Sequence, residues 1–416
     1  MHNFTRPRKT PGYVRPIGSY YSGMGTGTKL GTLCATLFLL PGAAVRARGE
    51  AIEQRLLEAN QLQHQGRYGD AEQAYLEFLR EAGKAGIEDA RVGQALNNLA
   101  SVCYAQARYS EAEELYRRAL AVWEKVAGTG SAEYAATLNN LAGISRIRGD
   151  YRQAGDLYLR AIRIIGKTGR GETGELAASL NNLAEVNRLT GNYAAAGPLY
   201  RRALAIRERI LGQDHPGVAV IANNLGVLSH QQGRLEEAEQ YFLRAIRIRE
   251  RALGGDHPDL GTSCNNLGSL YLGQRRRAEA EPLLRRALAI LQAKFPDGHP
   301  LTAAALQNLG GLFFQQGRYQ AAGQMYSRLL DGFAGDERRM PPVLSRLAAT
   351  YAAQGRNTEA ASCLKRSVAI LERSAQPGAP ELSEALRELA AIYRAEGRSE
   401  RAKDVTNKPG FSAGQP

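Results

Sequence analysis

The sequence predicts an all-α solenoid, a stack of antiparallel helix pairs, and three observations support this fold class. A five-residue string recurs at a constant spacing of 42 residues, and its six copies begin at Leu96, Leu138, Leu180, Ala222, Cys264 and Leu306. Two related strings begin at Leu344 and Leu386, which lie 38 and 42 residues further on. Only 16 Pro and 1 Trp occur, and Ala and Leu dominate the repeated part, which favours helix over strand. A fixed period of this length is typical of stacked repeats.

Each unit contains two helical stretches separated by a tight turn. The turn reads QGRY at 65–68, RGDY at 148–151, TGNY at 190–193 and QGRY at 316–319. Its Gly supplies the positive φ that ends a helix. The stretch that follows, such as EAEELYRRALAVWEKV from Glu111, is apolar at i, i+3, i+4 and i+7, as an amphipathic helix requires.

Small and large side chains recur at fixed positions of the second helix. The small ones are Ala112, Ala154, Ala196, Ala238, Ala280, Ala322 and Ala360. The large ones stand four residues later, at Tyr116, Tyr158, Tyr200, Phe242, Leu284, Tyr326 and Leu364. Packing a small residue against a large one lets two helices approach to about 8–10 Å, so these positions predict the core.

The first 47 residues differ from the rest and read as a leader. They carry six basic side chains and no acidic one, and an apolar run over 30–44 follows Lys29 and ends in small residues. This is the pattern of a secretory signal peptide, with cleavage after Ala44 or Ala47 and Met24 as a possible true start. The run is shorter than the roughly 20 residues that span a bilayer, so no stable transmembrane span is expected in the mature chain. We expect an exported (periplasmic or extracellular) protein. The alternative is a disordered basic leader on a cytoplasmic protein.

The remaining chain is predicted to be one repeat array. We place the solenoid at 48–406, with eight repeats and a shortened ninth, and a disordered tail at 407–416. The 38-residue step before Leu344 predicts that part of one loop is deleted.

The repeated residues resemble the tetratricopeptide-repeat (TPR) signature. The 42-residue period and the linkers LGQDHPGVA (211–219) and LGGDHPDLG (253–261) are similar to those of the kinesin-light-chain subclass. The resemblance implies a right-handed superhelix in which the first helix of each repeat lines a concave groove, and it implies protein or peptide partners. No heptad coiled coil precedes the repeats, so the motor-binding role of kinesin light chain is not implied.

Catalytic, metal and nucleic-acid functions are not expected. The formal charge is +13, but six basic residues lie in the leader, and the remaining +7 is a weak signal for nucleic acid. The four Cys are scattered without metal-ligand spacing. His215, His257 and His299 each precede a Pro, one per repeat, which reads as a helix start rather than a metal site. We therefore predict no enzyme activity, cofactor, metal or small-molecule substrate.

The Asn pair inside the repeated string is the candidate binding feature. On a helical wheel the second Asn points away from the core, and this set is Asn98, Asn140, Asn182, Asn224, Asn266 and Asn308. An Asn side chain both donates and accepts, so a row of them along the groove could clamp a peptide backbone. The first Asn, as at Asn97, lies at the core margin and is interpreted as bridging neighbouring repeats.

A second row lies five residues after the fourth residue of each string, which is Leu in all six copies (Leu99 in the first), and it reads Tyr104, Arg146, Arg188, His230, Leu272 and Phe314. Its first half is basic and its second half apolar, which suggests an acidic–hydrophobic peptide. The alternative is a set of scattered, solvated side chains.

We therefore predict a non-catalytic adaptor that binds an extended peptide or protein through the Asn ladder and Tyr104, Arg146, Arg188 and His230. The alternative is a structural scaffold that self-associates through its convex or end surfaces.

Overall fold

The structure, a computed structural model, describes residues 41–167, 171–374 and 380–411. Within these ranges it consists of helices and turns, with no strand, so the all-α prediction is confirmed. The signal-peptide prediction falls mainly on residues 1–40, which lie outside the described residues. The chain divides into two compact units after Gln213, and each unit is described by itself.

The helices of the first unit are α1 (Pro41–His64), α2 (Tyr68–Lys84), α3 (Ala90–Ala105), α4 (Tyr109–Val126), α5 (Ala132–Ile147), α6 (Tyr151–Lys167), α7 (Gly174–Leu189) and α8 (Tyr193–Leu211). Those of the second unit are α9 (Pro216–Gln231), α10 (Leu235–Leu253), α11 (Pro258–Gly273), α12 (Arg277–Gln292), α13 (Pro300–Gln315), α14 (Tyr319–Gly332), α15 (Pro341–Ala352), α16 (Asn357–Ser374), α17 (Pro380–Ala395) and α18 (Ser399–Thr406), with a 3₁₀ turn η1 (Glu337–Arg339).

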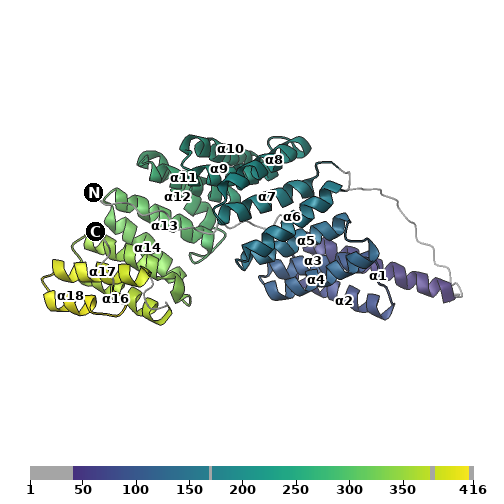
Figure 1. The fold of residues 1–416 in the computed structure, drawn as a ribbon, viewed down its shortest axis with the longest axis horizontal. Coiled ribbons are helices and arrows are strands. Elements are labelled where there is room, and N and C mark those ends of the chain that lie inside the picture. Colours follow the sequence, from purple (N-terminus) through teal and green to yellow (C-terminus); the bar gives the residue numbers. More distant parts are fainter. Residues whose placement is uncertain (1–40, 168–170, 375–379, 412–416) are drawn as a thin grey trace. The chain divides into compact units, whose positions relative to one another are not determined.

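Consecutive helices pair as the repeat pattern predicts, and the pairs stack in chain order within each unit (Figure 1). The first helices also contact one another directly, at α1–α3, α3–α5, α5–α7, α9–α11 and α11–α13. In each unit, we call this set of first helices the first-helix layer. Because it brings side chains from repeats about 42 residues apart into contact, it is the surface on which the Asn pairs meet.

The two ends of the array compare differently with their predicted bounds, because α18 ends at Thr406, the predicted last residue of the solenoid, whereas α1 begins before residue 48. Helix α1 begins at Pro41, inside the segment predicted as leader. At the other end, residues 407–411 follow α18, and Phe411 packs against a core cluster that contains Ala402 and Val405. The prediction of disorder from residue 407 is therefore wrong for 407–411, because an aromatic side chain finds apolar surface there.

The predicted small-and-large core is confirmed. The seven alanines of the second helices are fully buried, and the large residues four positions on are buried as well. The small residue of the first-helix string faces the same aromatic ring: a Cβ added to Gly226 would lie 2.6 Å from a ring carbon of Phe242. The two helices of a pair therefore approach to the limit that their small residues allow.

The turns keep one geometry even where the sequence lacks Gly. Gly149 and Gly317 adopt positive φ, as predicted, but so do Ala107 (φ 61°) and Arg275 (φ 61°) in the equivalent turns. A left-handed non-Gly residue costs about 1–2 kcal/mol. Packing of the flanking helices therefore dictates the turn conformation, and Gly lowers the free-energy cost of adopting it.

Histidine starts three helices of the second unit. The Nδ1 atoms of His215, His257 and His299 accept hydrogen bonds from the backbone N–H two residues later, at 3.0, 3.2 and 3.3 Å. Each His is thus the N-cap of its helix, with Pro at the next position. The helix-start interpretation of the His-Pro pairs is confirmed.

The shortened step near residue 340 affects helices instead of a loop. Helix α14 has 14 residues and α15 has 12, against 16 in α13. The segment between them, which contains η1, is retained. The prediction of a shortened loop is therefore wrong, because the helices absorb the deletion.

Arginines in the turns join neighbouring repeats by ion pairs. Arg108 pairs with Glu72 at 2.7 Å, and Arg276 pairs with Glu239 at 2.7 Å. In each case the Glu follows the buried alanine of the preceding second helix. Arg318 pairs with Glu281 at 2.9 Å in the same way.

Glu281 provides a test by pH. A hydrogen bond from Gln316, together with Arg318 and Arg285, lowers the pKa of Glu281 to about 2. The folded pKa lies below the ordinary value of 4.5, so the stabilisation is complete above that pH and is lost as the pH falls towards 2. We expect the wild type to lose more free energy of unfolding than Glu281→Gln on acidification through this range. Urea unfolding at several pH values measures it, and parallel acid profiles for the two proteins would contradict it.

Candidate functional site

The Asn pairs form hydrogen bonds between repeats, and these bonds define the Asn ladder. The Nδ2 of Asn140 donates to Oδ1 of Asn97, one repeat earlier, at 3.1 Å. Asn266 donates to Asn223 at 3.1 Å in the same register. A third rung joins Asn308 to Asn265 at 2.9 Å. The second Asn of one repeat thus meets the first Asn of the preceding repeat.

The first Asn of each rung is a buried or half-buried acceptor. Thr137 Oγ1 also donates to Asn97, at 3.3 Å, and Ser263 Oγ donates to Asn223, at 3.2 Å. In the second unit the network reaches deeper, because the guanidinium of Arg249 donates to Ser263. The interpretation of the first Asn as a bridge between repeats is confirmed at these rungs.

The ladder has a variant rung in the first unit. Asn98 Nδ2 donates at 2.9 Å to Asn60 of α1, which also accepts from the Tyr75 hydroxyl at 2.7 Å. Asn60 lies outside the repeated string, so the sequence pattern did not single it out.

A second variant near the C-terminus uses other residue types. Ser345 and Glu388 occupy ladder positions in repeats that lack Asn, and they share a hydrogen bond. Burial raises the pKa of Glu388. The two residues keep the register of the rung but replace the Asn pair by Ser and Glu. A search of the sequence for Asn could not find this rung.

The step between α5 and α7 departs from this pattern. The Oδ1 atom of Asn139 is buried without a hydrogen-bond partner. Asn182, its expected donor, instead accepts from its neighbour Asn181 at 3.3 Å. This rung is therefore not formed directly.

The predicted binding asparagines are covered to different degrees. Asn224 is buried, at 8% exposed, whereas Asn98, Asn140, Asn182, Asn266 and Asn308 are half-buried. Contact with a partner stays a prediction for all six.

The second predicted row is partly turned inward. Tyr104 is half-buried and packs edge-on against Tyr109, with ring centroids 5.6 Å apart. Arg146 is also half-buried and hydrogen-bonds to Tyr158. His230 is half-buried, and burial lowers its pKa.

The prediction that Arg188 presents its charge to a partner needs correction. Arg188 is 4% exposed, and its guanidinium donates to both carboxylate oxygens of Glu185, at 2.6 and 2.8 Å. The Tyr200 hydroxyl donates to the same carboxylate at 2.6 Å, and the pKa of Tyr200 is raised well above its ordinary value, first by burial and then by Glu185. Glu185 therefore neutralises Arg188 inside the fold. The sequence pattern placed Arg188 in a row beside the asparagines but could not supply its partner.

Comparison with known proteins identifies the repeat. Tetratricopeptide-repeat family models match residues 55–122, 91–167, 175–250, 221–293, 265–337 and 339–407. These matches cover well over half of the chain. The chain belongs to the tetratricopeptide-repeat family. The predicted TPR repeats are confirmed, and the kinesin-light-chain character remains a resemblance of period and linkers.

Solved structures with similar folds come from several organisms. BtubC from P. vanneervenii is 26% identical to this TPR chain, with a TM-score of 0.45, over 58% of this chain and 92% of that one. The quorum sensor NprR from B. thuringiensis is 15% identical, with a TM-score of 0.61, over 86% and 97%. A signal transduction ATPase with numerous domains and a TPR sensor, from Pyrococcus horikoshii, is 17% identical, with a TM-score of 0.64, over 86% and 51%. The last two support the fold only. No curated protein matches the chain.

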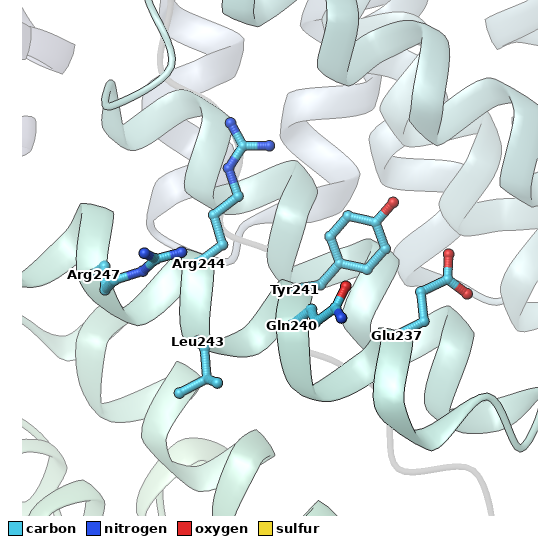
Figure 2. A pocket seen from close by; sticks show the side chains of 6 residues that line it. All are labelled: Glu237, Gln240, Tyr241, Leu243, Arg244 and Arg247. Carbon is cyan, nitrogen blue, oxygen red and sulfur yellow. The ribbon is translucent and has the colours of Figure 1, made fainter.

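The TPR chain also has a shallow surface pocket on α10 (Figure 2). It is lined by Glu237, Gln240, Tyr241, Leu243, Arg244 and Arg247. All six belong to one helix, and none was among the predicted site residues. The pocket therefore does not join the Asn ladder.

The described part of the TPR chain has neither a metal-site cluster nor a membrane-spanning helix. No cluster of three His, Cys, Asp or Glu side chains has the arrangement of a metal site there. Nor does any helix in those ranges have the length and apolar character needed to cross a bilayer.

Proposed function

We propose that this TPR chain is a non-catalytic adaptor that holds an extended peptide or protein segment on its first-helix layer. The observation that carries the proposal is the register of the Asn ladder. Within each unit the second asparagines lie on the first-helix layer, and five of the six are half-buried and so remain partly accessible.

The ladder leaves hydrogen-bonding capacity for a ligand. An Asn Nδ2 carries two N–H groups, and a rung such as Asn140 to Asn97 uses one of them. Neighbouring first helices pack about 9–10 Å apart, and an extended peptide rises about 3.3 Å per residue. One Asn would therefore meet every third ligand residue and could donate to its backbone carbonyl without reading its side chain.

Side chains beside the ladder would supply selectivity. In the first unit these are Tyr104 and Arg146, and in the second unit they are Leu272 and Phe314. Because Glu185 neutralises Arg188, Arg146 is the remaining cationic side chain of the row beside the ladder in the first unit. We therefore propose that a ligand segment held on the first unit carries a polar or acidic residue, and that a segment held on the second unit carries an apolar residue.

A phage-displayed library of random nonapeptides, selected on the full chain, tests this function. We expect selected peptides to bind the wild type and to lose binding on the triple change of Asn140, Asn182 and Asn224 to Ala, with helical circular dichroism retained. Failure to select any peptide, or equal binding by the folded triple variant, would reject the proposal.

Self-association is a second candidate, favoured by exposed leucines. Leu76, Leu159 and Leu243 are 51%, 42% and 40% exposed and occupy the same position in α2, α6 and α10. Light scattering over a range of concentrations distinguishes it, because an adaptor without self-association keeps a constant mass.

Export also belongs to the proposal, and only the sequence of the leader supports it. Mass spectrometry of the mature N-terminus tests it. A start near Val45 or Arg48 is expected, and an intact leader would exclude cleavage.

A further inference from the structure

The six second asparagines are unequal donors, and the difference lies in their Nδ2 groups. Those of Asn98, Asn140, Asn266 and Asn308 each donate to a side chain one repeat earlier, at 2.9 to 3.1 Å. A ligand at these positions must accept from an Nδ2 group that already donates one hydrogen bond to the preceding repeat.

Asn182 differs from these four. Its one hydrogen bond is made by Oδ1, which accepts from Asn181 at 3.3 Å, and its Nδ2 donates to no group of the described residues. The acceptor in ladder register, Asn139 Oδ1, is correspondingly without a partner. Both N–H groups of Asn182 are thus uncommitted on a half-buried side chain.

The neighbouring helix carries a glycine beside this step. Gly143 lies four residues after Asn139, on the same face of α5. A Cβ added there would make ordinary contacts with the Tyr158 hydroxyl, at 3.8 Å, and with the Tyr104 side chain, at 4.0 Å. The equivalent position on α7 is filled by Glu185, which Arg188 and Tyr200 hold. The α5 side of the α5–α7 step therefore lacks the carboxylate that α7 carries at this position.

We propose that Asn182 is the main anchor of the ligand, and that the ligand is an extended peptide whose backbone carbonyl accepts from Asn182 Nδ2. The proposal rests on the function proposed above. Under it, Asn182 acts in binding, whereas Asn140, Asn266 and Asn308 act first in joining repeats. Both N–H groups of Asn182 are open to the ligand, whereas one N–H group of each of the other three is already used between repeats.

A matched pair of substitutions separates the two roles. Asn182→Asp keeps the oxygen that accepts from Asn181 and removes only the Nδ2 donor. Asn140→Asp makes the same chemical change one repeat earlier, where the new carboxylate would face Oδ1 of Asn97, so that two acceptors oppose each other. Since both changes add one negative charge, the comparison cancels the effect of charge alone.

The probe is a fluorescein-labelled nonapeptide taken from the phage selection, with both ends blocked. We expect Asn182→Asp to weaken its binding about tenfold or more, as loss of a hydrogen bond would, and to leave the melting temperature unchanged. Asn140→Asp should lower the melting temperature and weaken binding less. Equal or greater weakening by Asn140→Asp, or a lowered melting temperature for Asn182→Asp, would overturn the proposal while the adaptor function stands.

A second measurement needs no ligand. With isotope-labelled asparagine, the side-chain amide protons of Asn182 should exchange with solvent faster than those of Asn140, Asn266 and Asn308. Equal protection would overturn the inference by itself. If the library gives no binding peptide, the adaptor function and the anchor fail together.

Discussion

Replacing Glu185 by Ala is expected to destabilise the first unit by about 3–5 kcal/mol, the usual cost of removing one member of a buried ion pair. Glu185 is 3% exposed and Arg188 is 4% exposed, so the guanidinium left behind could not reach water without rearrangement. The Tyr200 hydroxyl would also lose its acceptor, which is 2.6 Å away. Urea unfolding followed by circular dichroism measures the change.

A double variant provides the control for this prediction. Glu185→Leu combined with Arg188→Met removes both charges and keeps the volume apolar, so it should recover most of the lost stability. If Glu185→Ala were as stable as the wild type, the buried pair would not contribute as argued. A double variant no better than the single one would show that the loss comes from packing instead of the stranded charge.

Gly298→Ala is expected to have the next largest effect, about 1–3 kcal/mol and towards the upper end of that range. A Cβ at Gly298 would lie 1.9 Å from the carbonyl oxygen of Gly332, and backbone cannot move aside as a flexible side chain can. The linker is held in place by Arg328, which pairs with Asp297 at 2.9 Å, and by Arg339, which donates to the Gly298 carbonyl at 3.0 Å. Thermal unfolding of the second unit measures the effect.

Gly255→Ala is the matched control, because Gly255 lies in the equivalent linker one repeat earlier. There an added Cβ would meet only the Arg286 guanidinium, at 3.9 Å. We expect a change within about 0.5 kcal/mol. Similar losses for the two variants would mean that flexibility of the linker, and not the close backbone contact, sets the cost.

Much of the fold could be predicted because its causes are local and repeated. Each helix carries its own amphipathic pattern, and each pair has its small and large core residues at fixed offsets. The burial of Ala112 and Tyr116, the turn at Gly149 and the N-cap at His215 all follow from residues a few positions apart. The wrong predictions concern features that depend on contacts between residues far apart in the sequence. Phe411 finds apolar surface that composition could not reveal, and the deletion near residue 340 shortens helices because the connecting segment is needed.

The candidate site was predictable only as a row of positions. A helical wheel shows that Asn98 and its equivalents point away from their own core, but it contains no information on the adjacent helix. The rung from Asn140 to Asn97 joins residues 43 apart in the chain. The same limit applies to Arg188, which the sequence offered as a binding residue but which is 4% exposed and paired with Glu185 in the fold.

By itself, the sequence determined the helix pairs, their core and the TPR family of this chain, because the spacing of apolar residues along each helix predicts which of its positions are buried. Only the tertiary structure decided which polar groups form hydrogen bonds between repeats. Hydrogen bonds between repeats depend on where two separate helices meet, and a difference of a fraction of an ångström makes or breaks them. That is why six asparagines that look alike in the sequence differ in the fold, and why Asn182 alone, of those whose contacts are described, keeps its donor uncommitted.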